Sequence, residues 1–354
     1  MSEKSCLNQT PRELGYRMPA EWSKHEAVWL SWPHDPTTFI SGVEKVEETY
    51  LQIIELLHRD EYVNLFVKDS DTRRRVTGLL EQRNIDVGRV RFFEFDYADV
   101  WFRDYGPIFV KKGNKDLAMV RWVFNSWGEK YDELLKDKEV PEVMNRRMHL
   151  KCFKPGIVLE GGSIDVNGKG TLLTTQECLL NKNRNPHLTK EKIEGFLQDY
   201  LGVTHIVWLE CGIAGDDTDG HVDDIARFLN PTTVVCAYED GDDENGVVLR
   251  SNYEILCRST DQDDRKLRVV KLPMPGNVLW EGKPLPASYT NFYIGNKTVL
   301  APTFESQNDE AALSILRKLF PNRKVVGVDC LDLICGFGAI HCITQQQPKV
   351  ANKL

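Results

Sequence analysis

Cys342 is the residue of this sequence best suited to nucleophilic chemistry. It lies in residues 336–345, GFGAIHCITQ, where two glycines precede a short run of β-branched residues. Glycine allows close approach of a backbone or ligand, and Ile and Thr favour an extended strand. We therefore expect Cys342 on a stiff strand beside a loop with little side-chain bulk, where a nucleophile is approachable from one side. The alternative is that Cys342 is only a small buried hydrophobe, as cysteines often are.

Acidic and imidazole side chains that could assist such a nucleophile occur in three other stretches. The candidates are Asp104 (in WFRD), Glu160 (in EGGS), and His221 and Asp223 (in DGHVDD). An imidazole can set the protonation of a thiol and carry protons to a leaving group. His221 and Asp223 would point the same way on an extended segment, and Glu160 could orient the imidazole. Two carboxylates, Asp104 and Asp223, would suit a planar guanidinium cation, which pairs with carboxylates in bidentate geometry.

Several of these residues also have a purely structural explanation. Asp104 follows Arg103 and could be no more than its ion-pair partner. A single histidine such as His221 is more often structural than catalytic. The acidic residues 216–219 could form a solvated turn or a weak cation site.

The secondary structure expected from the hydrophobic pattern repeats along the chain. Strand–turn–strand patterns are expected around residues 114, 168, 231 and 296, each followed by a helix and another strand. The helices are expected at residues 129–146, 190–200, 244–260 and 308–319.

Residues 27–95 would form a fifth unit that lacks one hairpin strand, and residues 339–344 can supply it. A ring of five such units would bring Cys342 and the four candidates named above into one central pocket. The rival is a doubly wound sheet, which would instead alternate single strands with helices.

Composition limits the classes of function. The 354 residues are 41% hydrophobic and 28% charged, as in an ordinary soluble domain, and the net charge is −8. This charge argues against a nucleic-acid surface and is compatible with attracting a small cation. The nine cysteines include no Cys-x-x-Cys pair, which favours a reduced cytosolic chain. With no apolar signal segment at the N-terminus and no membrane-length apolar run, we expect a cytoplasmic protein in which residues 1–19 form a polar arm on a single domain.

Six motifs, in one order along nearly the whole chain, resemble those of the agmatine deiminase family, which includes bacterial peptidyl-arginine-deiminase-like proteins. They are MPAEW (18–22, with Trp29 and Trp32), WFRDYGP (101–107), LEGGS (159–163), TTQECLLNKNR (174–184), TDGHVDD (218–224) and IHCITQQQP (340–348). The resemblance implies an α/β fold of the pentein type, a five-bladed α/β propeller of pseudo-five-fold ββαβ repeats around a central active site. It also implies hydrolysis of a guanidine without a metal or an organic cofactor.

The resemblance further implies roles for single residues. These are Cys342 as nucleophile, His221 as general acid/base, Glu160 as the partner of His221, and Asp104 and Asp223 as guanidinium anchors. Trp101 would lie against the methylene chain of the substrate, and Asp217 and Asp219 are candidates for its distal amine. The sequence departs from the usual family pattern at Tyr105, Asp165, Phe337 and Ala339. None of these removes a catalytic group, but Phe337 could narrow the mouth of the pocket.

We therefore expect hydrolysis of agmatine to N-carbamoylputrescine and ammonia through a covalent amidino-cysteine intermediate, in putrescine biosynthesis. Deimination of peptidyl-arginine or free arginine is the alternative within the same chemistry, and the peptide substrate would need an open groove. A non-catalytic polyamine- or cation-binding protein is the alternative from another class. A metal-dependent hydrolase using His221, Asp223 and Asp224 would lose activity with a chelator, but no paired histidine spacing supports it. The expected partner is the small cationic substrate rather than a nucleic acid or a membrane, and assembly into a homo-oligomer is left open.

Overall fold

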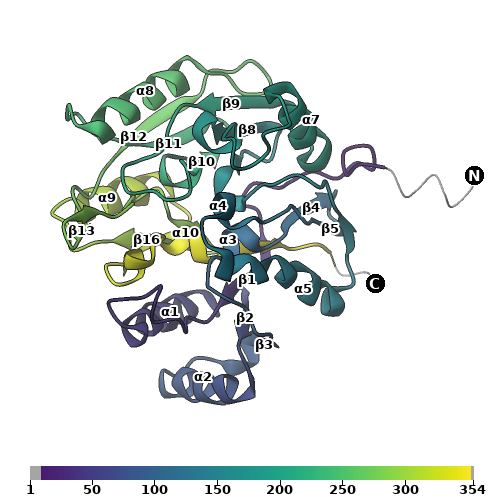
Figure 1. Cartoon of the computed structure of the whole chain (residues 1–354), viewed down its shortest axis with the longest axis vertical. Coiled ribbons are helices and arrows are strands. Elements are labelled where there is room, and N and C mark those ends of the chain that lie inside the picture. The colour runs from purple at the N-terminus through teal and green to yellow at the C-terminus, as the bar shows by residue number, and fades with distance from the viewer. Residues whose placement is uncertain (1–8, 352–354) are drawn as a thin grey trace, which may run out of the picture.

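The computed structural model describes residues 9–351, and five of its sheets share one strand pattern (Figure 1). In each sheet two strands pair antiparallel, and a third strand then adds parallel to the second. Four of these sheets are β4(Ile108–Lys112)–β5(Asp116–Val120)–β6(Lys151–Phe153), β7(Asp165–Val166)–β8(Thr171–Thr175)–β9(His205–Leu209), β10(Ala226–Asn230)–β11(Thr233–Tyr238)–β12(Arg268–Pro273) and β15(Tyr293–Ile294)–β16(Thr298–Thr303)–β17(Lys324–Asp329). The fifth is β18(Gln345–Pro348)–β1(His25–Ser31)–β2(Tyr62–Val67)–β3(Val90–Glu94), which joins the two ends of the described chain.

Helices connect the parallel strands of each sheet, because two parallel neighbours can be joined only by a crossover connection, which is usually an α-helix. They are α1(Val43–Leu57), α2(Ser70–Gln82), α5(Val140–Met148), α7(Lys190–Leu201), α8(Glu244–Arg258) and α9(Asp309–Leu319). In Figure 1, α1, α2, α7 and α8 lie at the outside of the molecule, whereas the one-turn helices α3(Phe102–Tyr105) and α10(Ile340–Ile343) lie near its middle. A small hairpin, β13(Leu279–Trp280)–β14(Lys283–Pro284), and a further single turn, α6(Gln176–Leu179), complete the elements used below.

The predicted hairpins, and the predicted crossover helices other than the one over residues 129–146, are confirmed to within a few residues. The turn between β7 and β8 shows the local reason. Oδ1 of Asn167 accepts the backbone N–H groups of Lys169, Gly170 and Thr171 at 2.9, 3.0 and 2.9 Å. Gly168 has φ of 66°, a conformation that glycine adopts without strain. The five units therefore share the predicted strand topology, whereas their arrangement as the blades of a propeller stays a prediction.

The predicted continuous helix over residues 129–146 is wrong. The segment contains α4(Ser126–Glu129), a 3₁₀ helix over Asp132–Glu139, and α5. Trp127 and Gly128 have positive φ values of 52° and 91°, which interrupt the helical path before it can propagate. Asn125 caps this first turn by accepting the N–H of Gly128 at 3.0 Å.

The prediction that residues 339–344 form the closing strand is also wrong, and with it the placement of Cys342 on a strand. Cys342 lies in the single helical turn α10, and the closing strand is β18, directly after it. Oγ1 of Thr344 donates to the carbonyl of Ile340 at 2.9 Å, and its N–H donates to that of His341 at 3.1 Å. These local bonds, made possible by tertiary contacts, outweigh the strand propensity of the β-branched residues.

The predicted polar arm over residues 1–19 is partly packed against the body of the protein, and residues 1–8 lie outside the described residues. The N–H of Arg12 donates to the carbonyl of Asp199 at 2.9 Å, and that of Met18 donates to the carbonyl of Leu201 at 2.8 Å. Arg17 forms an antiparallel bridge with Lys111. Residues 10–18 therefore bind to the end of α7 and to β4.

Buried hydrophobic side chains form three clusters. The largest contains residues of α1 and β1 to β3 together with residues of β16, β17 and α10, so it joins the first and last units. The second lies around β4, β5, β8 and α7, and the third around β9 to β12 and α8. The apolar faces of the crossover helices supply much of this core, which fixes the short central turns that carry the candidate site.

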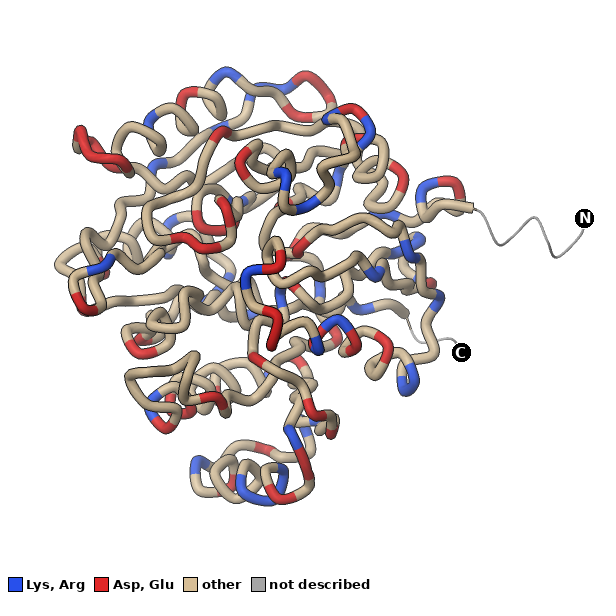
Figure 2. Tube along the Cα trace, viewed as in Figure 1, with Lys and Arg blue, Asp and Glu red and all other residues tan. Residues whose placement is uncertain are grey.

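Charged residues of both signs are interspersed along the outer elements (Figure 2). Among residues 9–351, the helices are too short or too polar for any of them to traverse a bilayer.

Candidate active site

A pocket of about 190 Å³ lies beside α10 and is lined by residues from distant parts of the chain. Cys342 and Asp104 both line it, from α10 and α3. Trp101 and Trp127 supply aromatic walls, and Phe337 lies at its edge with 43% of its surface exposed. Thus the structure brings together a thiol, a carboxylate and aromatic side chains that are separated by more than 200 residues in sequence.

The Cys342 thiol is positioned by contacts on two sides. The side chain of Asn291 donates to Sγ at 3.1 Å, and Oδ1 of Asn291 accepts the N–H of His341 at 2.8 Å. On the other side lies Gly338: a Cβ added there would come within 2.4 Å of the Trp101 ring and 3.0 Å of Cβ of Cys342. Glycine is therefore required at 338 so that Trp101 can pack against the turn that holds the thiol.

The electrostatic surroundings of Cys342 favour the neutral thiol over the thiolate. Burial, followed by the charges of Asp223, Asp224 and Asp104, raises the pKa of Cys342 well above its ordinary value. A carboxylate oxygen of Asp223, one of Asp224 and Sγ of Cys342 lie within 4.8 Å of one another. A cation bound among these groups would offset the repulsion and favour the thiolate.

Asp104 lies in the turn α3, immediately before β4, and both of its carboxylate oxygens accept hydrogen bonds. Oδ1 accepts the N–H of Gly162 and Oδ2 accepts the indole N–H of Trp127, each at 2.9 Å. The pKa of Asp104 is raised by burial, although the nearby His221 opposes this shift. Arg103 points elsewhere and donates to the side chain of Gln345 at 2.7 Å, so the alternative of a simple Arg103–Asp104 ion pair does not describe the structure.

His221 and Asp223 both face buried charges, but the extended segment expected for them is wrong. His221 precedes a 3₁₀ turn over Val222–Asp224. Nδ1 of His221 lies 3.8 Å from Oδ1 of Asp104. Oδ2 of Asp223 lies 2.6 Å from Nδ1 of His341, while Oδ1 has no hydrogen-bond partner within residues 9–351. Asp104 thus links the Cys342 pocket to His221, and Asp223 keeps one oxygen free.

The pKa of His221 is raised well above its ordinary value. Burial alone would lower it, but the charge of Asp104, contact with Cys178 and the charge of Asp223 outweigh burial. His221 is accordingly protonated at neutral pH, the state needed to donate a proton to a leaving group.

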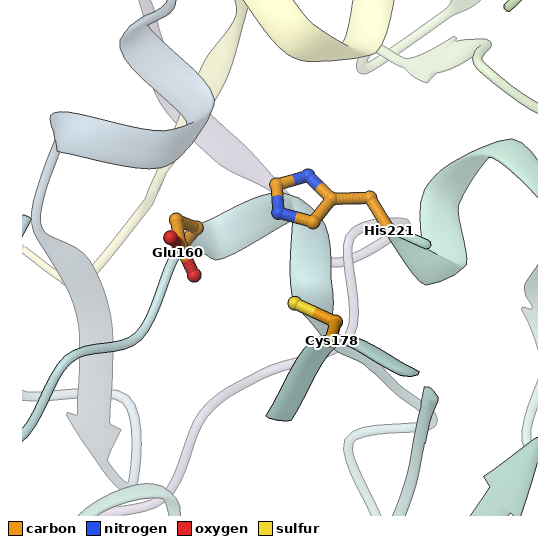
Figure 3. Close-up of side chains that lie close together, drawn as sticks. All are labelled: Glu160, Cys178 and His221. Carbon is orange, nitrogen blue, oxygen red and sulfur yellow. The ribbon is translucent and has the colours of Figure 1, made fainter. Parts of the chain in front are cut away.

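Glu160 and Cys178 lie on the other side of the His221 ring, with the sulfur of Cys178 below the imidazole and Glu160 beside it (Figure 3). One potential ligand atom of each residue lies within 4.8 Å of the others. Oε1 of Glu160 accepts Nε of Arg184 at 2.7 Å, whereas Oε2 of Glu160 and Nε2 of His221 are buried without a hydrogen-bond partner in the described chain. The predicted pairing of Glu160 with His221 is thus close in space but unbonded. Sulfur, nitrogen and oxygen donors suit zinc, but the Arg184 cation on Glu160 disfavours a second cation there.

The three predicted substrate-binding residues other than the guanidinium anchors differ in their position relative to the pocket. Trp101 lines the pocket, and its indole donates to Oδ2 of Asp99 at 3.1 Å. Asp217 also lines the pocket and accepts the hydroxyl of Tyr131 at 2.8 Å. Asp219 does not line it, because its carboxylate binds Lys130, Asn183 and Arg184 at 2.8, 2.9 and 2.6 Å.

The four departures from the family pattern have structural explanations. Phe337 adopts φ of 70° and lines the pocket mouth, as expected. The hydroxyl of Tyr105 donates to the carbonyl of Asp99 at 2.9 Å, and Asp165 forms an ion pair with the buried Arg227. Ala339 is buried immediately before α10. None of these residues replaces a group of the pocket described above.

Sequence reasoning missed several residues around the site. Asn291 binds the thiol from a loop about 50 residues away, and no motif marks it. Cys178 and His341 lie within two of the family motifs, but their residue types alone predict no role for them. Glu21 also stands in a quoted motif, and its carboxylate lies 2.8 Å from Nε2 of His341. The roles of these four residues depend on tertiary contacts that residue spacing does not reveal.

This chain is similar to known proteins over nearly its whole length. Residues 17–348 match the model of the Porphyromonas-type peptidyl-arginine deiminase family. A relative named agmatine deiminase, from Pseudomonas syringae pv. tomato, is 38% identical over 368 residues, covering 97% of this chain and 98% of the relative. Among solved structures, the agmatine deiminase of Enterococcus faecalis has a TM-score of 0.89 at 34% identity, covering 98% of this chain and 99% of that one. A C. jejuni agmatine deiminase variant with substrate bound has a TM-score of 0.85 at 31% identity, covering 95% and 97% of the two chains.

Proposed function

The chain belongs to the Porphyromonas-type peptidyl-arginine deiminase family, and on that premise we propose that it hydrolyses agmatine to N-carbamoylputrescine and ammonia. The observation that carries the proposal is the buried thiol of Cys342 beside the carboxylates of Asp104, Asp223 and Asp224. Such a site repels anions, suits a planar guanidinium, and holds a nucleophile next to it. The names of the similar proteins support agmatine as the guanidine.

The proposal includes the wider architecture and setting. Residues 1–354 form one catalytic domain, and the five sheets are the blades of a pentein propeller whose inner turns carry the site. This arrangement explains why α3, which directly precedes β4, and α10, which directly precedes β18, meet near the middle of the molecule (Figure 1). The product is a carbamoyl amine, so the reaction belongs to putrescine synthesis, and the residues at the site suffice for it without an added group.

The reaction begins when the guanidinium of agmatine binds between Asp104 and Asp223. Its positive charge offsets the carboxylates that raise the pKa of Cys342, and the thiol releases its proton to solvent. The thiolate attacks the guanidinium carbon, the C–N π electrons move onto nitrogen, and an uncharged tetrahedral adduct forms, whose N–H groups the two aspartates bind. His221, protonated at rest, donates a proton to one nitrogen, which leaves as ammonia.

The remaining amidino-thioether is then hydrolysed. His221, now neutral, removes a proton from water, and the resulting hydroxide attacks the same carbon. The second tetrahedral adduct collapses by expelling the Cys342 thiolate, which takes up the proton of the new hydroxyl group and so returns to the resting thiol. One water has been consumed, one ammonia released, and the substrate carbon has become the carbonyl of N-carbamoylputrescine.

The test is the rate of ammonia release from agmatine, free arginine and peptidyl-arginine at equal concentrations. We expect agmatine to be preferred, because a pocket of about 190 Å³ suits a small unbranched cation. Free arginine carries an extra carboxylate, which the acidic lining disfavours. Activity on arginine or peptidyl-arginine without activity on agmatine would contradict the substrate assignment and favour the alternative within the family.

Asp217 gives a pH-dependent prediction for the distal ammonium of agmatine. Burial, followed by the neighbouring Asp216, raises the pKa of Asp217 to about 6. Its carboxylate is therefore ionised above about pH 6, and KM for agmatine should fall as pH rises through that value. Asp217→Asn should raise KM at pH 8 by roughly 10-fold, the loss expected for one charged hydrogen bond, and should make KM nearly independent of pH between 5 and 8.

The matched control is Asp132→Asn, which removes a charge from an exposed residue nearby that does not line the pocket. It should keep the KM profile of the unchanged protein. The folded-state pKa of Asp217 lies above its ordinary value, so its ionised form costs stability at neutral pH. Asp217→Asn should therefore not lower the melting temperature at pH 8. An unchanged KM profile in this variant would assign the distal ammonium to another group.

A further inference from the structure

His341, the residue directly before Cys342, uses both ring nitrogens to bind buried carboxylates. Nδ1 lies 2.6 Å from Oδ2 of Asp223, and Nε2 lies 2.8 Å from Oε2 of Glu21. The three side chains are almost fully buried, and His341 is 2% exposed. An ionised carboxylate can only accept hydrogen bonds, so both nitrogens of His341 must donate. The arrangement is an imidazolium held between two carboxylates.

Glu21 holds this imidazolium through its second ring nitrogen and is itself fixed by several contacts. Oε1 of Glu21 accepts the N–H of Ile294 at 2.7 Å, and Oε2 also accepts Arg227 at 2.5 Å. A guanidinium nitrogen of Arg103 lies 3.9 Å from the same oxygen, and Nε of Arg103 donates to the carbonyl of His341 at 3.2 Å. The charged groups facing His341 are therefore Glu21, Asp223, Arg227 and Arg103. Three elements of the fold hold Glu21 in place.

Asp223 is the point at which this buried network reaches the reacting groups. One of its oxygens binds His341, while Oδ1 is buried and has no partner in the described part of the chain. Burial would raise the pKa of Asp223, but the hydrogen bond and charge of His341 are the first causes that lower it below its ordinary value. Without His341, a rotation about the carboxylate bond would cost little, and Asp223 would lose a fixed acceptor direction.

We propose, on the basis of the function proposed above, that His341 is a positioning residue that fixes the Asp223 carboxylate with one oxygen free for the substrate guanidinium. His341 does not touch the substrate and acts through Asp223. Glu21 completes this arrangement, because it binds the second ring nitrogen of His341 and so holds the imidazolium in a single orientation. The neighbouring Cys342 turn and the guanidinium anchor are thereby held by one side chain.

A double-mutant cycle tests the coupling. His341→Gln should raise KM for agmatine and lower kcat/KM by roughly 10- to 100-fold, as loss of an orienting group typically does. In the Asp223→Asn background, where no anion remains to be oriented, the same His341→Gln change should lower kcat/KM by less than about 3-fold further. Additive losses in the two backgrounds would overturn the proposal, because they would mean that His341 acts independently of Asp223.

His25→Gln is a matched control, since it also removes a buried histidine–carboxylate pair. Nδ1 of His25 lies 2.9 Å from Oε2 of Glu61, away from the pocket lining. His25→Gln should lower the melting temperature as much as His341→Gln does, without a comparable rise in KM, and its effect should add to that of Asp223→Asn. If it raised KM as much as His341→Gln does, the effect of His341 would be a general loss of packing.

A second measurement uses the unchanged protein and does not depend on the variants folding. Nitrogen-15 spectra of the protein should show that both ring nitrogens of His341 carry a proton, as its two donated hydrogen bonds require, with the signals assigned through the only His–Cys pair in the sequence. A neutral ring would overturn the proposal. Agmatine turnover by the unchanged protein tests the function alone, so failure there is distinct from an absent imidazolium or from additive losses.

Discussion

Cys342→Ala should abolish ammonia release from agmatine, with a loss of at least about 10⁴-fold, while agmatine still binds. The nucleophile is the only route to the amidino-thioether in the proposed reaction, and the neighbouring groups cannot replace it. Asp104 and Asp223, which we propose bind the guanidinium, are unchanged in this variant. Binding should even tighten slightly, because alanine removes the cost of ionising a thiol whose pKa is raised. Calorimetry with agmatine measures binding, and a coupled ammonia assay measures turnover.

Cys335→Ala is the matched control for the loss of a thiol from the pocket. Cys335 lines the same cavity and is also buried, but its thiol contacts the carbonyl of Leu331 rather than the acidic cluster. This variant should keep most of its turnover. Full activity in Cys342→Ala would contradict the mechanism. Unchanged agmatine binding with no turnover in the unmodified protein would instead favour the non-catalytic polyamine binder.

His221→Asn should lower kcat by roughly 10²- to 10⁴-fold, the range expected when a general acid/base is removed. Both half-reactions need His221, first as the acid for departing ammonia and then as the base for water. Without His221, ammonia can still leave from an adduct that solvent has protonated, whereas water is a poor nucleophile without a base. The second half-reaction, hydrolysis of the amidino-thioether, should therefore slow more. The amidino-thioether on Cys342 should therefore accumulate, and mass spectrometry of the intact protein should show agmatine less ammonia bound to the chain.

The control for this experiment is His58→Asn. His58 is buried, and its Nδ1 binds the carbonyl of Ile54 in α1, away from the pocket. It should neither lower kcat substantially nor trap an adduct. An adduct on a residue other than Cys342, or a His221→Asn variant with ordinary kcat, would require a different assignment of the roles.

The sequence was sufficient for the elements whose pattern is set locally. Helix α7 over Lys190–Leu201 and helix α9 over Asp309–Leu319 agree with the predicted bounds to within one residue, because the spacing of their apolar residues delimits them. The helix around residue 129 failed because positive φ at Trp127 breaks it, and no side chain in the pattern signals that conformation. Cys342 was assigned to a strand because β-branched neighbours dominated, whereas contacts with Asn291 hold a helical turn.

The same distinction between local pattern and tertiary contact applies to the candidate site. Residue types and motifs made the thiol, the imidazole and the acids candidates, because few other types can do this chemistry. The partners of these residues could not be predicted. Arg184 on Glu160 and His341 on Asp223 are contacts between segments far apart in sequence, and only the folded chain defines them. For that reason Asp219 was a reasonable candidate from sequence but belongs to a separate ion-pair group.

The pairing of β1 with β18 has a consequence for synthesis on the ribosome. His25 lies opposite Pro348 and Trp29 opposite Gln345, so one edge of β1 has no neighbour until residues 345–348, more than 300 residues later, have emerged. The nascent chain must keep this edge from pairing with other chains while those residues are made, which makes it a natural point for chaperone protection. Because the proposed nucleophile directly precedes β18, a product that stopped before residue 342 would be both aggregation-prone and, under the proposed mechanism, inert.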